Sequence, residues 1–354
     1  MKRESKKKVL LIAAACMGLV LTGGCEKESG KGNEIREKYF FVDNAEYVDG
    51  ATPGGTEAMI SDLTVNRSAI TGGSTVLQFT SSERLTTVHI GVNGVPGYYR
   101  CDVSRTEPVR NGNGYEYQVV LLLSQRLSAD FNIFVSAVSV AGAISMTVNS
   151  TEIAVIEVGT GKLQISLSWD KLDDVDLILV DPNNNAIFYA QPFAFDRPVS
   201  EEVWDEYSET FSYTSSTWED RKAFFTSRGY RIIGELDLDS NAACDIDGVN
   251  NENITYEETA IPGSYAVAVN LWEKCTASGA KGSSYSVTAN HNGDPVRIAS
   301  RQTGKFADSD LGNSGLDVDK MVIIGTFTIG GTRSDRPAGP KQLVPIRKRA
   351  DGKK

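Results

Sequence analysis

The sequence predicts an all-β protein made of two consecutive β-sandwiches, and two observations support this fold class. From about residue 60 onward, short segments in which apolar and polar residues alternate follow one another, which is the pattern of half-buried strands. Turn-forming residues, mainly Gly, Asn, Asp and Ser, separate these segments. The chain has 354 residues, of which 40% are hydrophobic, so it is long enough for about two domains with separate cores.

The N-terminus predicts export and a lipid anchor. An apolar run over residues 9–21 follows five basic residues, as in a secretory signal, and is shorter than the roughly 20 residues that span a bilayer. The run ends in a Leu-Thr-Gly-Gly-Cys sequence that resembles a bacterial lipobox, with Cys25 as the cysteine. The resemblance implies a signal peptide over 1–24, lipidation of Cys25, a tether over 25–58 and attachment to the cell envelope, at the outer membrane. The alternative is an ordinary cleavage site that happens to contain Cys25.

Residues 59–158 predict the first sandwich. Seven strand-like segments occur here, and Asn93-Gly94 is among the turns between them. Seven strands in roughly 100 residues are typical of an immunoglobulin-like sandwich, which most simply serves as a spacer or interaction module. The segments cover residues 63–66, 75–80, 86–92, 115–123, 131–140, 144–148 and 153–158.

Residues 162–330 predict the second sandwich and contain a set of short motifs. These are Trp169, Asp174-Val175-Asp176-Leu177, Asp181-Pro182-Asn183, Leu236-Asp237-Leu238-Asp239, Glu252-Asn253-Ile254 and Pro262-Gly263-Ser264-Tyr265. Their order resembles the bacterial pre-peptidase C-terminal type of β-sandwich, in the uncharacterised branch often found beside von Willebrand factor A modules. The resemblance covers about residues 163–330 and implies a binding or accessory domain of the envelope rather than an enzyme.

Residues 191–232 form an insertion relative to that family. Ser200 is placed to cap a helix, and a second helical segment follows over 216–225, so the insertion is predicted to be partly helical. Two roles are open for its aromatic side chains: they pack onto the sandwich, which is the commoner outcome, or they line a binding surface for a sugar or a protein. These side chains are Trp204, Tyr207, Trp218, Phe224 and Phe225.

Pairs of acidic residues in the second unit suggest a calcium site. Asp174 and Asp176 are two residues apart, as are Asp237 and Asp239, so on a strand each pair projects from one face. Like charges on one face are unfavourable unless a cation lies between them, and carboxylate oxygens suit calcium. The alternative is that they are turn residues and solvated faces. The full predicted metal set is Asp174, Asp176, Asp237, Asp239, Asn241, Asp247 and Glu252.

The cysteines predict one disulfide. Outside the signal and Cys25, only Cys101, Cys244 and Cys275 remain, and an odd number in an oxidising compartment leaves one unpaired. Cys244 and Cys275 lie in the same predicted domain, so we expect them to be bridged. Cys101 is then a small buried apolar residue.

Charge and residue types limit the function. The net charge is −10 although residues 331–354, predicted to be a disordered tail, are basic. The acidic body therefore repels nucleic acid. The two histidines, His89 and His291, fall in different predicted domains, and no catalytic spacing is evident. We therefore predict a non-catalytic, lipid-anchored binding or adhesion protein that recognises an extracellular glycan or protein. An accessory or inhibitor-like lipoprotein acting on an envelope enzyme is the alternative, and a glycan hydrolase is the third possibility.

Overall fold

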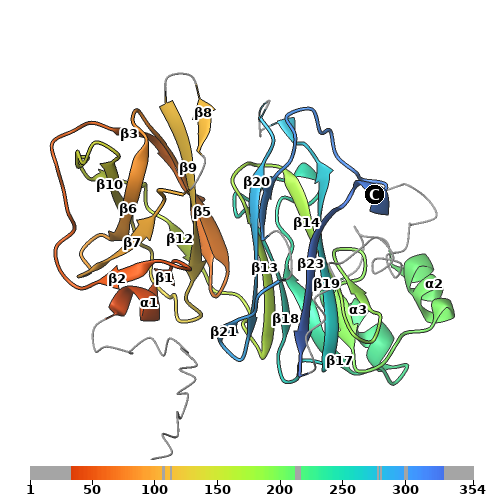
Figure 1. Cartoon of the computed structure of the whole chain (residues 1–354). Coiled ribbons are helices and arrows are strands. Elements are labelled where there is room, and N and C mark those ends of the chain that lie inside the picture. Colours follow the sequence, from red (N-terminus) through yellow and green to blue (C-terminus); the bar gives the residue numbers. More distant parts are fainter. Residues whose placement is uncertain are drawn as a thin grey trace, which may run out of the picture. The chain divides into compact units, whose positions relative to one another are not determined.

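The computed structural model describes residues 33–330 except 106–107, 112–113, 212–216, 277–278, 280 and 299–301 (Figure 1). The predicted signal peptide, Cys25 and the basic tail lie outside these residues. Most regular structure in the described part is β-strand, with three α-helices, so the predicted all-β fold is confirmed. No helix in the described part is both long and apolar enough to cross a membrane.

The first region, residues 33–158, contains two antiparallel sheets and a small parallel pair. One sheet has the order β1 (Phe40–Phe41), β9 (Gly114–Leu123), β5 (Ser74–Ser81) and β3 (Ile60–Thr64), with β8 (Val109–Asn111) also beside β9. The other has the order β11 (Val148–Asn149), β10 (Ile133–Ser139), β6 (Leu85–Val92), β7 (Tyr98–Asp102) and β2 (Glu46–Val48). The parallel pair is β4 (Ser68–Ile70) with β12 (Ala154–Ile156).

This region begins earlier than predicted. Helix α1 (Glu34–Lys38) buries Ile35, and β1 and β2 pair with β9 and β7. Ile35, Phe40 and Val42 belong to the same hydrophobic core as the long strands of both sheets. The prediction of a tether over 25–58 is therefore wrong from residue 33 onward. Elements of two to five residues are too short to show a periodic pattern in the sequence.

The second region also has two sheets. The larger has the order β16 (Phe193–Phe195), β17 (Ile232–Leu238), β18 (Asn251–Tyr256), β13 (Leu163–Trp169), β20 (Ser284–His291) and β21 (Asp294–Pro295), with β22 (Thr303–Lys305) also beside β20. The smaller has the order β15 (Ala186–Ile187), β14 (Asp174–Val180), β19 (Gly263–Glu273) and β23 (Val322–Ile329). Two short 3-10 helices, η1 (Ala242–Cys244) and η3 (Val318–Lys320), lie in loops.

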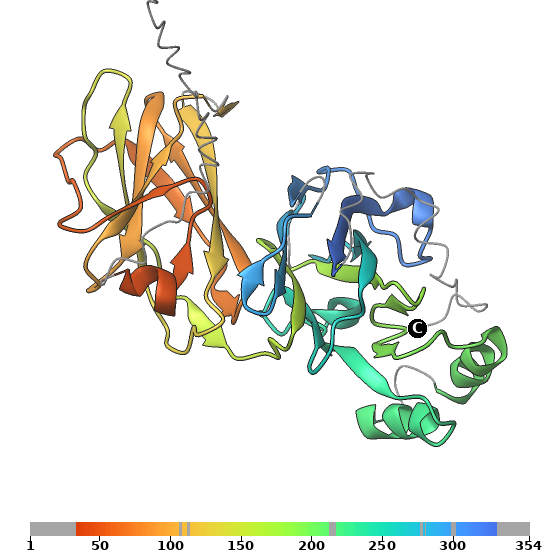
Figure 2. The same ribbon diagram turned by 60° about the horizontal axis from the view of Figure 1, so that its bottom comes forward.

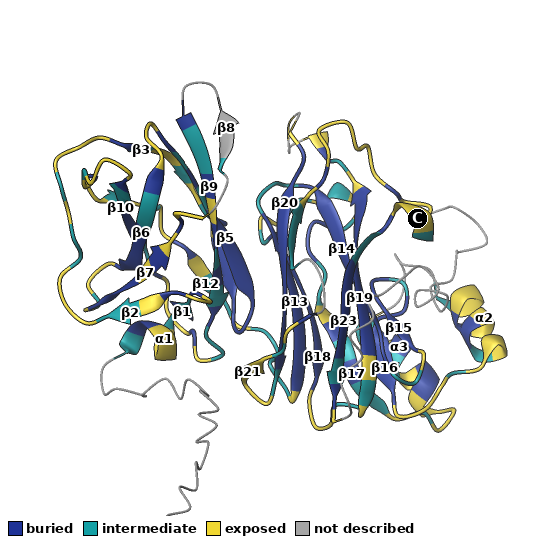
Figure 3. Ribbon diagram, in the orientation of Figure 1, coloured by how far each residue is buried: buried dark blue, intermediate teal, exposed yellow. Residues whose placement is uncertain are grey.

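Both sheets of the second region contribute to one hydrophobic core, and the central strands β13, β18 and β20 of the large sheet are buried on both faces (Figure 3). On β13, Leu163, Ile165 and Leu167 belong to that core. The polar residues between them are also buried, because they face residues of the first region. Gln164 Nε2 donates to the Thr71 carbonyl at 2.6 Å, and Asn66 Nδ2 donates to Ser168 Oγ at 3.3 Å. Apolar and polar residues therefore alternate along β13 because its apolar side chains face the core and its polar side chains form hydrogen bonds with the first region.

The insertion contains two helices, as predicted: α2 (Glu201–Thr210) and α3 (Trp218–Thr226) (Figure 2). Thr217 and Asp220 form a capping box at the start of α3, in which the side chain of each accepts from the main-chain N–H of the other. The aromatic rings of both helices pack with those of β16 into a small core separate from the main one. We call this the satellite core; its buried members are Phe193, Phe195, Trp204, Tyr207, Phe224 and Phe225.

Candidate functional site

An acidic cluster lies where β14, β18 and the end of β17 meet. Glu252 of β18 is paired in register with Leu167, so its side chain points into the core between the sheets. Its Oε2 accepts a hydrogen bond from the Leu177 N–H of β14, in the opposite sheet, at 2.5 Å. Its Oε1 is buried and has no hydrogen-bond partner among the described residues. Glu252 is thus a carboxylate that joins the two sheets with only one oxygen satisfied.

The surroundings of Glu252 disfavour its charged form. Burial is the main cause that raises the pKa of Glu252 well above its usual range, and the nearby negative charges of Asp239, Asp176 and Asp174 raise it further. The hydrogen bond from Leu177 acts in the opposite direction. Four carboxyl groups from three segments therefore interact electrostatically; three of them are buried, and that of Asp239 is half-buried.

The other members of the cluster are held by polar contacts. Asp174 Oδ2 accepts from the Ala243 N–H at 2.7 Å. Asp176 Oδ2 accepts from Asn270 Nδ2 at 2.8 Å, and Asn270 Oδ1 accepts from Asn313 Nδ2 at 2.8 Å. These contacts hold the two β14 carboxylates in position.

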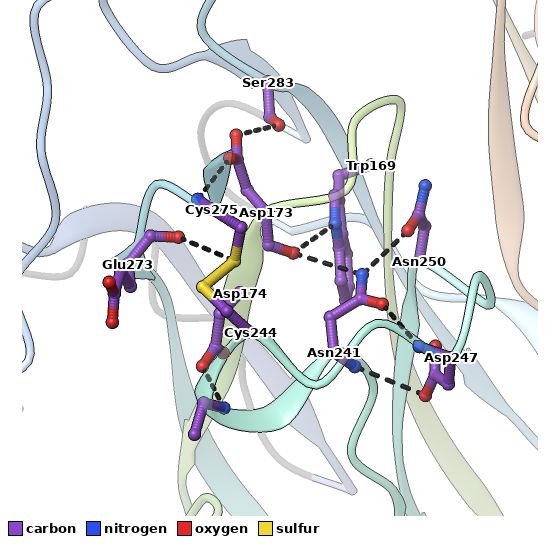
Figure 4. Close-up of a disulfide and its surroundings, with 11 residues drawn as sticks. Trp169, Asp173, Asp174, Asn241, Cys244, Asp247, Asn250, Glu273, Cys275 and Ser283 are labelled. Carbon is purple, nitrogen blue, oxygen red and sulfur yellow. Dashed lines mark hydrogen bonds between the residues drawn. A yellow bond between two sulfur atoms is a disulfide. The ribbon is translucent and has the colours of Figure 1, made fainter. Parts of the chain in front are cut away.

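A disulfide braces the loop that covers this cluster. Cys244 and Cys275 are bonded, with a Cα–Cα distance of 5.6 Å, which confirms the predicted pair (Figure 4). Asn241, Ala243 and Cys244 all have positive φ angles, a conformation that L-residues rarely adopt. Such strain persists only when surrounding contacts hold it. Here the disulfide and the Ala243–Asp174 hydrogen bond do so.

The carboxylate of Asp173 holds the segment between β19 and β20, to which the disulfide joins this loop. Its Oδ1 accepts from the Cys275 N–H at 3.1 Å and its Oδ2 from Ser283 Oγ at 2.6 Å (Figure 4). Its carbonyl accepts from Trp169 Nε1 and Asn241 Nδ2. Asp173 therefore has a structural role beside the cluster. Its place in the sequence, directly before Asp174, did not indicate this role.

The structure does not bring all the predicted metal ligands together. A register shift in β17 between Leu236 and Leu238 places Asp237 away from Asp239, so the two do not share a face. Asp237 instead accepts from the Gly159 N–H and from Asn253 Nδ2, both at 2.7 Å. Desolvation, as the largest effect, raises the pKa of Asp237 to about 6. Leu238 pairs with Asn253 in the antiparallel register of β17 and β18. The next residue along, Asp239, therefore lies beside Glu252.

Two further predicted ligands lie in the loop. Asn241 and Asp247 hydrogen-bond to each other through main-chain and side-chain atoms, at 3.2 and 3.3 Å. Asn241 Nδ2 also donates to Asn250 Oδ1. The structure thus brings Asp174, Asp176, Asp239 and Glu252 together and uses Asp237, Asn241 and Asp247 in loop and linker contacts. Within the described residues, no group of three or more His, Cys, Asp or Glu side chains stands ready to hold a metal ion.

The predicted aromatic surface is a core instead. Trp204, Tyr207, Phe224 and Phe225 are buried, and Trp218 is half-buried with its Nε1 donating to Glu235 Oε2 at 3.2 Å. The Phe225 ring lies 4.6 Å from that of Phe195 and 4.9 Å from that of Tyr207, measured between centroids. Of the two roles open for these rings, packing is the one the structure displays, and the four buried rings provide no exposed surface.

A groove runs between α3, β17 and the segment that follows β18. Its volume is about 810 Å³. Lys222 of α3 and Glu235 of β17 form an ion pair across it at 2.8 Å. Gly229 and Gly234 lie along it, and its remaining walls combine charged and hydroxyl side chains with the apolar ones of Ala223, Tyr230, Ile232 and Ile233; most of these residues are exposed or half-buried. The lining residues are Glu219, Lys222, Ala223, Thr226, residues 229–235, Glu257, Glu258 and Thr259.

The remaining reactive side chains are dispersed. His89 is buried in β6 against Ser136, whereas His291 ends β20 in the second region. Cys101 is the free cysteine of the described part, and burial raises the pKa of its thiol to about 12. Its thiol therefore stays protonated and behaves as the buried apolar residue that we expected.

No family model matches this chain, and no curated protein matches it.

Proposed function

We propose that the protein is a lipid-anchored binding protein of a bacterial cell envelope that recognises an extracellular glycan or protein and catalyses no reaction. In this proposal the two regions are consecutive β-sandwiches, the first immunoglobulin-like and the second of the pre-peptidase C-terminal type. In each region the strands of both sheets share one hydrophobic core, which supports this architecture. The signal-like N-terminus supports the location, and the disulfide is compatible with an oxidising compartment.

The groove beside α3 is the observation on which the binding role depends. One wall is the helical insertion, which the satellite core fixes against β16 and β17. A concave site supported by rigid elements loses little conformational freedom when a ligand binds. The satellite core thus explains why the insertion carries so many aromatic residues without exposing them.

The charges of the groove limit the chemistry of its ligand. Four carboxylates line it, from Glu219, Glu235, Glu257 and Glu258, against two cations, Lys222 and Arg231. This excess of negative charge repels acidic polymers and favours neutral ligands with many hydrogen-bonding groups, such as glycan hydroxyls or peptide groups.

Filling the groove tests this proposal. Thr226 is exposed on the groove wall, so Thr226→Trp should occupy the groove without entering the core. We expect the purified protein to bind a subset of neutral glycans on an array, and the variant to bind them at least about tenfold more weakly, a loss of about 1.4 kcal/mol. Glu209→Trp, at an exposed position of α2 outside the groove, is the matched control and should bind normally.

A photocrosslinking amino acid at position 226 covers the case of a protein partner. Cells that produce this variant should form a discrete adduct upon irradiation, and the same amino acid at position 209 should not. If the array detects no glycan binding and neither position crosslinks, the groove is not a recognition site.

Release from membranes tests the anchor. The acyl chains on Cys25 would supply the apolar area that holds the protein to a bilayer. We therefore expect Cys25→Ser to move the protein from the membrane fraction to the supernatant. A variant that remains wholly with membranes would contradict the anchoring proposal.

A further inference from the structure

We propose that the groove beside α3 binds the basic segment 341–349 of this chain's own C-terminal tail, so that the tail occupies the groove until a ligand displaces it. The tail is residues 331–354, which follow Gly330 and lie outside the described residues. The contact between tail and groove does not depend on the groove's ligand. Its displacement by a ligand rests on the binding function proposed above.

The first argument is the place where the tail leaves the fold. Ile329, the last residue of β23, pairs with Gly263 at the start of β19. A Cβ atom placed on Gly330 would lie 3.4 Å from the Cβ of Pro262. Pro262 follows Thr259 of the groove wall by three positions, so their Cα atoms are at most about 11 Å apart. The tail therefore begins beside the groove.

The second argument is charge. The tail contains eight basic residues and two acidic ones. Both cations of the groove are already paired, since Lys222 Nζ lies 2.8 Å from Glu235 Oε2 and Arg231 Nε lies 3.6 Å from Asp196 Oδ2. Three exposed carboxylates of the groove form no ion pair with any described residue, namely Glu219, Glu257 and Glu258. The groove therefore attracts a basic segment.

The third argument is the order of residue types in segment 341–349, which reads Lys-Gln-Leu-Val-Pro-Ile-Arg-Lys-Arg. Its apolar residues lie between a basic residue on one side and three on the other. The groove offers both kinds of contact, because Tyr230, Ile232 and Ile233 are half-buried whereas its unpaired carboxylates are exposed. Buried apolar area contributes affinity, and ion pairs at the rim set the orientation.

The length of the connection makes weak binding sufficient. Residues 331–340 join Gly330 to the segment and span at most about 36 Å when extended, which is longer than the path from Pro262 to the groove. A connection of this length gives an effective concentration of about 1 mM. A contact with a dissociation constant of about 1 mM is therefore about half-occupied within one chain.

Photocrosslinking in the purified full-length protein tests this contact without any ligand. A photocrosslinking amino acid at position 226 lies on the exposed groove wall. We expect irradiation to link it to residues 341–349 of the same chain, which leaves the mass of the protein unchanged and is identified by peptide mass spectrometry. An increase from about 0.15 M to about 1 M salt should lower the yield, because the screening length falls from about 8 to about 3 Å.

Charge variants of the groove show whether the link is specific. Glu257→Gln combined with Glu258→Gln should lower the yield about fivefold, as expected for the loss of two exposed ion pairs. The matched control is Glu202→Gln combined with Glu209→Gln, which removes two exposed carboxylates of α2 outside the groove. This control should leave the yield unchanged.

A tail variant connects the contact to ligand binding. Arg347→Gln, Lys348→Gln and Arg349→Gln together should lower the yield of the link. They should also raise the affinity for the neutral glycans that the array detects about twofold, because a half-occupied groove halves the apparent affinity. If the array detects no glycan and the link responds to charge as expected, the proposed glycan recognition fails and the tail contact stands. If glycans bind and position 226 links to no tail peptide, the binding function stands and this inference fails.

Three results would overturn the inference. Equal yields in the groove variant and its matched control would indicate a non-specific contact. A link between two chains that increases with protein concentration would assign the groove to the tail of a second copy. The third result is the absence of the link while the Cys25→Ser protein sediments with phosphatidylglycerol vesicles through residues 347–349, which would assign the tail to a membrane surface.

Discussion

The two regions of the molecule bury very different groups. Among its described residues, the first region buries uncharged polar side chains and His89 but no Asp or Glu. The second buries Asp173, Asp174, Asp176, Asp181 and Glu252. Burying a carboxylate is unfavourable for folding unless something compensates for it. The first region thus has the composition of a structural scaffold. In the second region, the buried carboxylates lower the stability of the fold and give its interior a concentration of acidic groups.

The two regions also differ in the number of their hydrophobic cores. The first region has one core, with which α1 and the short N-terminal strands are continuous. The second has a main core and the satellite core of the insertion. We therefore expect a core substitution in the first region to destabilise that whole region, and one in the insertion to destabilise the insertion alone.

The largest expected effect comes from deleting a ring in each type of core. Phe225 and Phe79 are both fully buried, and Phe→Ala at such sites costs about 3 to 5 kcal/mol. Phe79→Ala should speed amide hydrogen exchange in β5, β6, β9 and β10 together. Phe225→Ala should speed it only within residues 193–232. Faster exchange in β13 and β14 of the Phe225 variant would show that the satellite core is not an independent unit.

Reduction of the disulfide should weaken the second region alone. Cys244 and Cys275 are separated by 31 positions, and opening a loop of this size costs roughly 3 to 4 kcal/mol in the chain-entropy model. All four tryptophans, at 169, 204, 218 and 272, lie in the second region, so their fluorescence reports on that region. We expect reductant to lower the urea midpoint measured by fluorescence.

Cys101 provides the control for this experiment. Cys101→Ala removes a buried sulfur but no bridge, so its effect should be the same with and without reductant. A wild-type midpoint that does not respond to reductant would mean that the bridge contributes nothing to stability.

The smallest effect, on the order of 1 kcal/mol, is a pH response of opposite sign in the two regions. Burial, followed by the charge of Arg100, lowers the pKa of His89, so the first region should lose stability as the pH falls below about 6.5. Burial raises the pKa of Asp181 and Glu252, which therefore hold protons more tightly when folded. The second region should then gain stability as the pH falls from 7 toward about 4.

Exchange rates in chelator, followed from pH 7 to 5, check this difference. They should rise in β6 and β10 and fall in β14 and β18. If the exchange rates of both regions changed in the same direction, the predicted opposite pH dependence of the two regions would be wrong.

The long strands were predictable because their alternation extends over many residues. Segments 75–80, 86–92 and 115–123 fall within β5, β6 and β9. β7 was missed since Tyr98 and Tyr99 are adjacent and both buried, which breaks the alternation. Burial of the polar face of β13 was also not predictable, because it depends on partners such as Thr71, more than ninety positions away.

The candidate site was predictable in residue type and only partly in membership. The Asp174/Asp176 pair was predicted because two acidic residues at positions i and i+2 of a strand share a face, and Glu252 was included because it follows a further group of acidic residues close in sequence. Asp237 was included wrongly in the set, since strict alternation places it with Asp239 and a bulge cannot be identified from spacing alone. The groove left no signal, because its walls come from segments whose contact depends on the tertiary fold.

From the pairings of the central strand of the large sheet we expect a particular order of folding. β13 is flanked by β18 and β20, which follow it by more than eighty residues, and β14 must wait for β19. The last strand, β23, then closes the smaller sheet against β19. Pairings this distant in sequence make folding slow. We therefore expect the second region to stay open until β23 has emerged, whereas the first can close as soon as residue 156 is available.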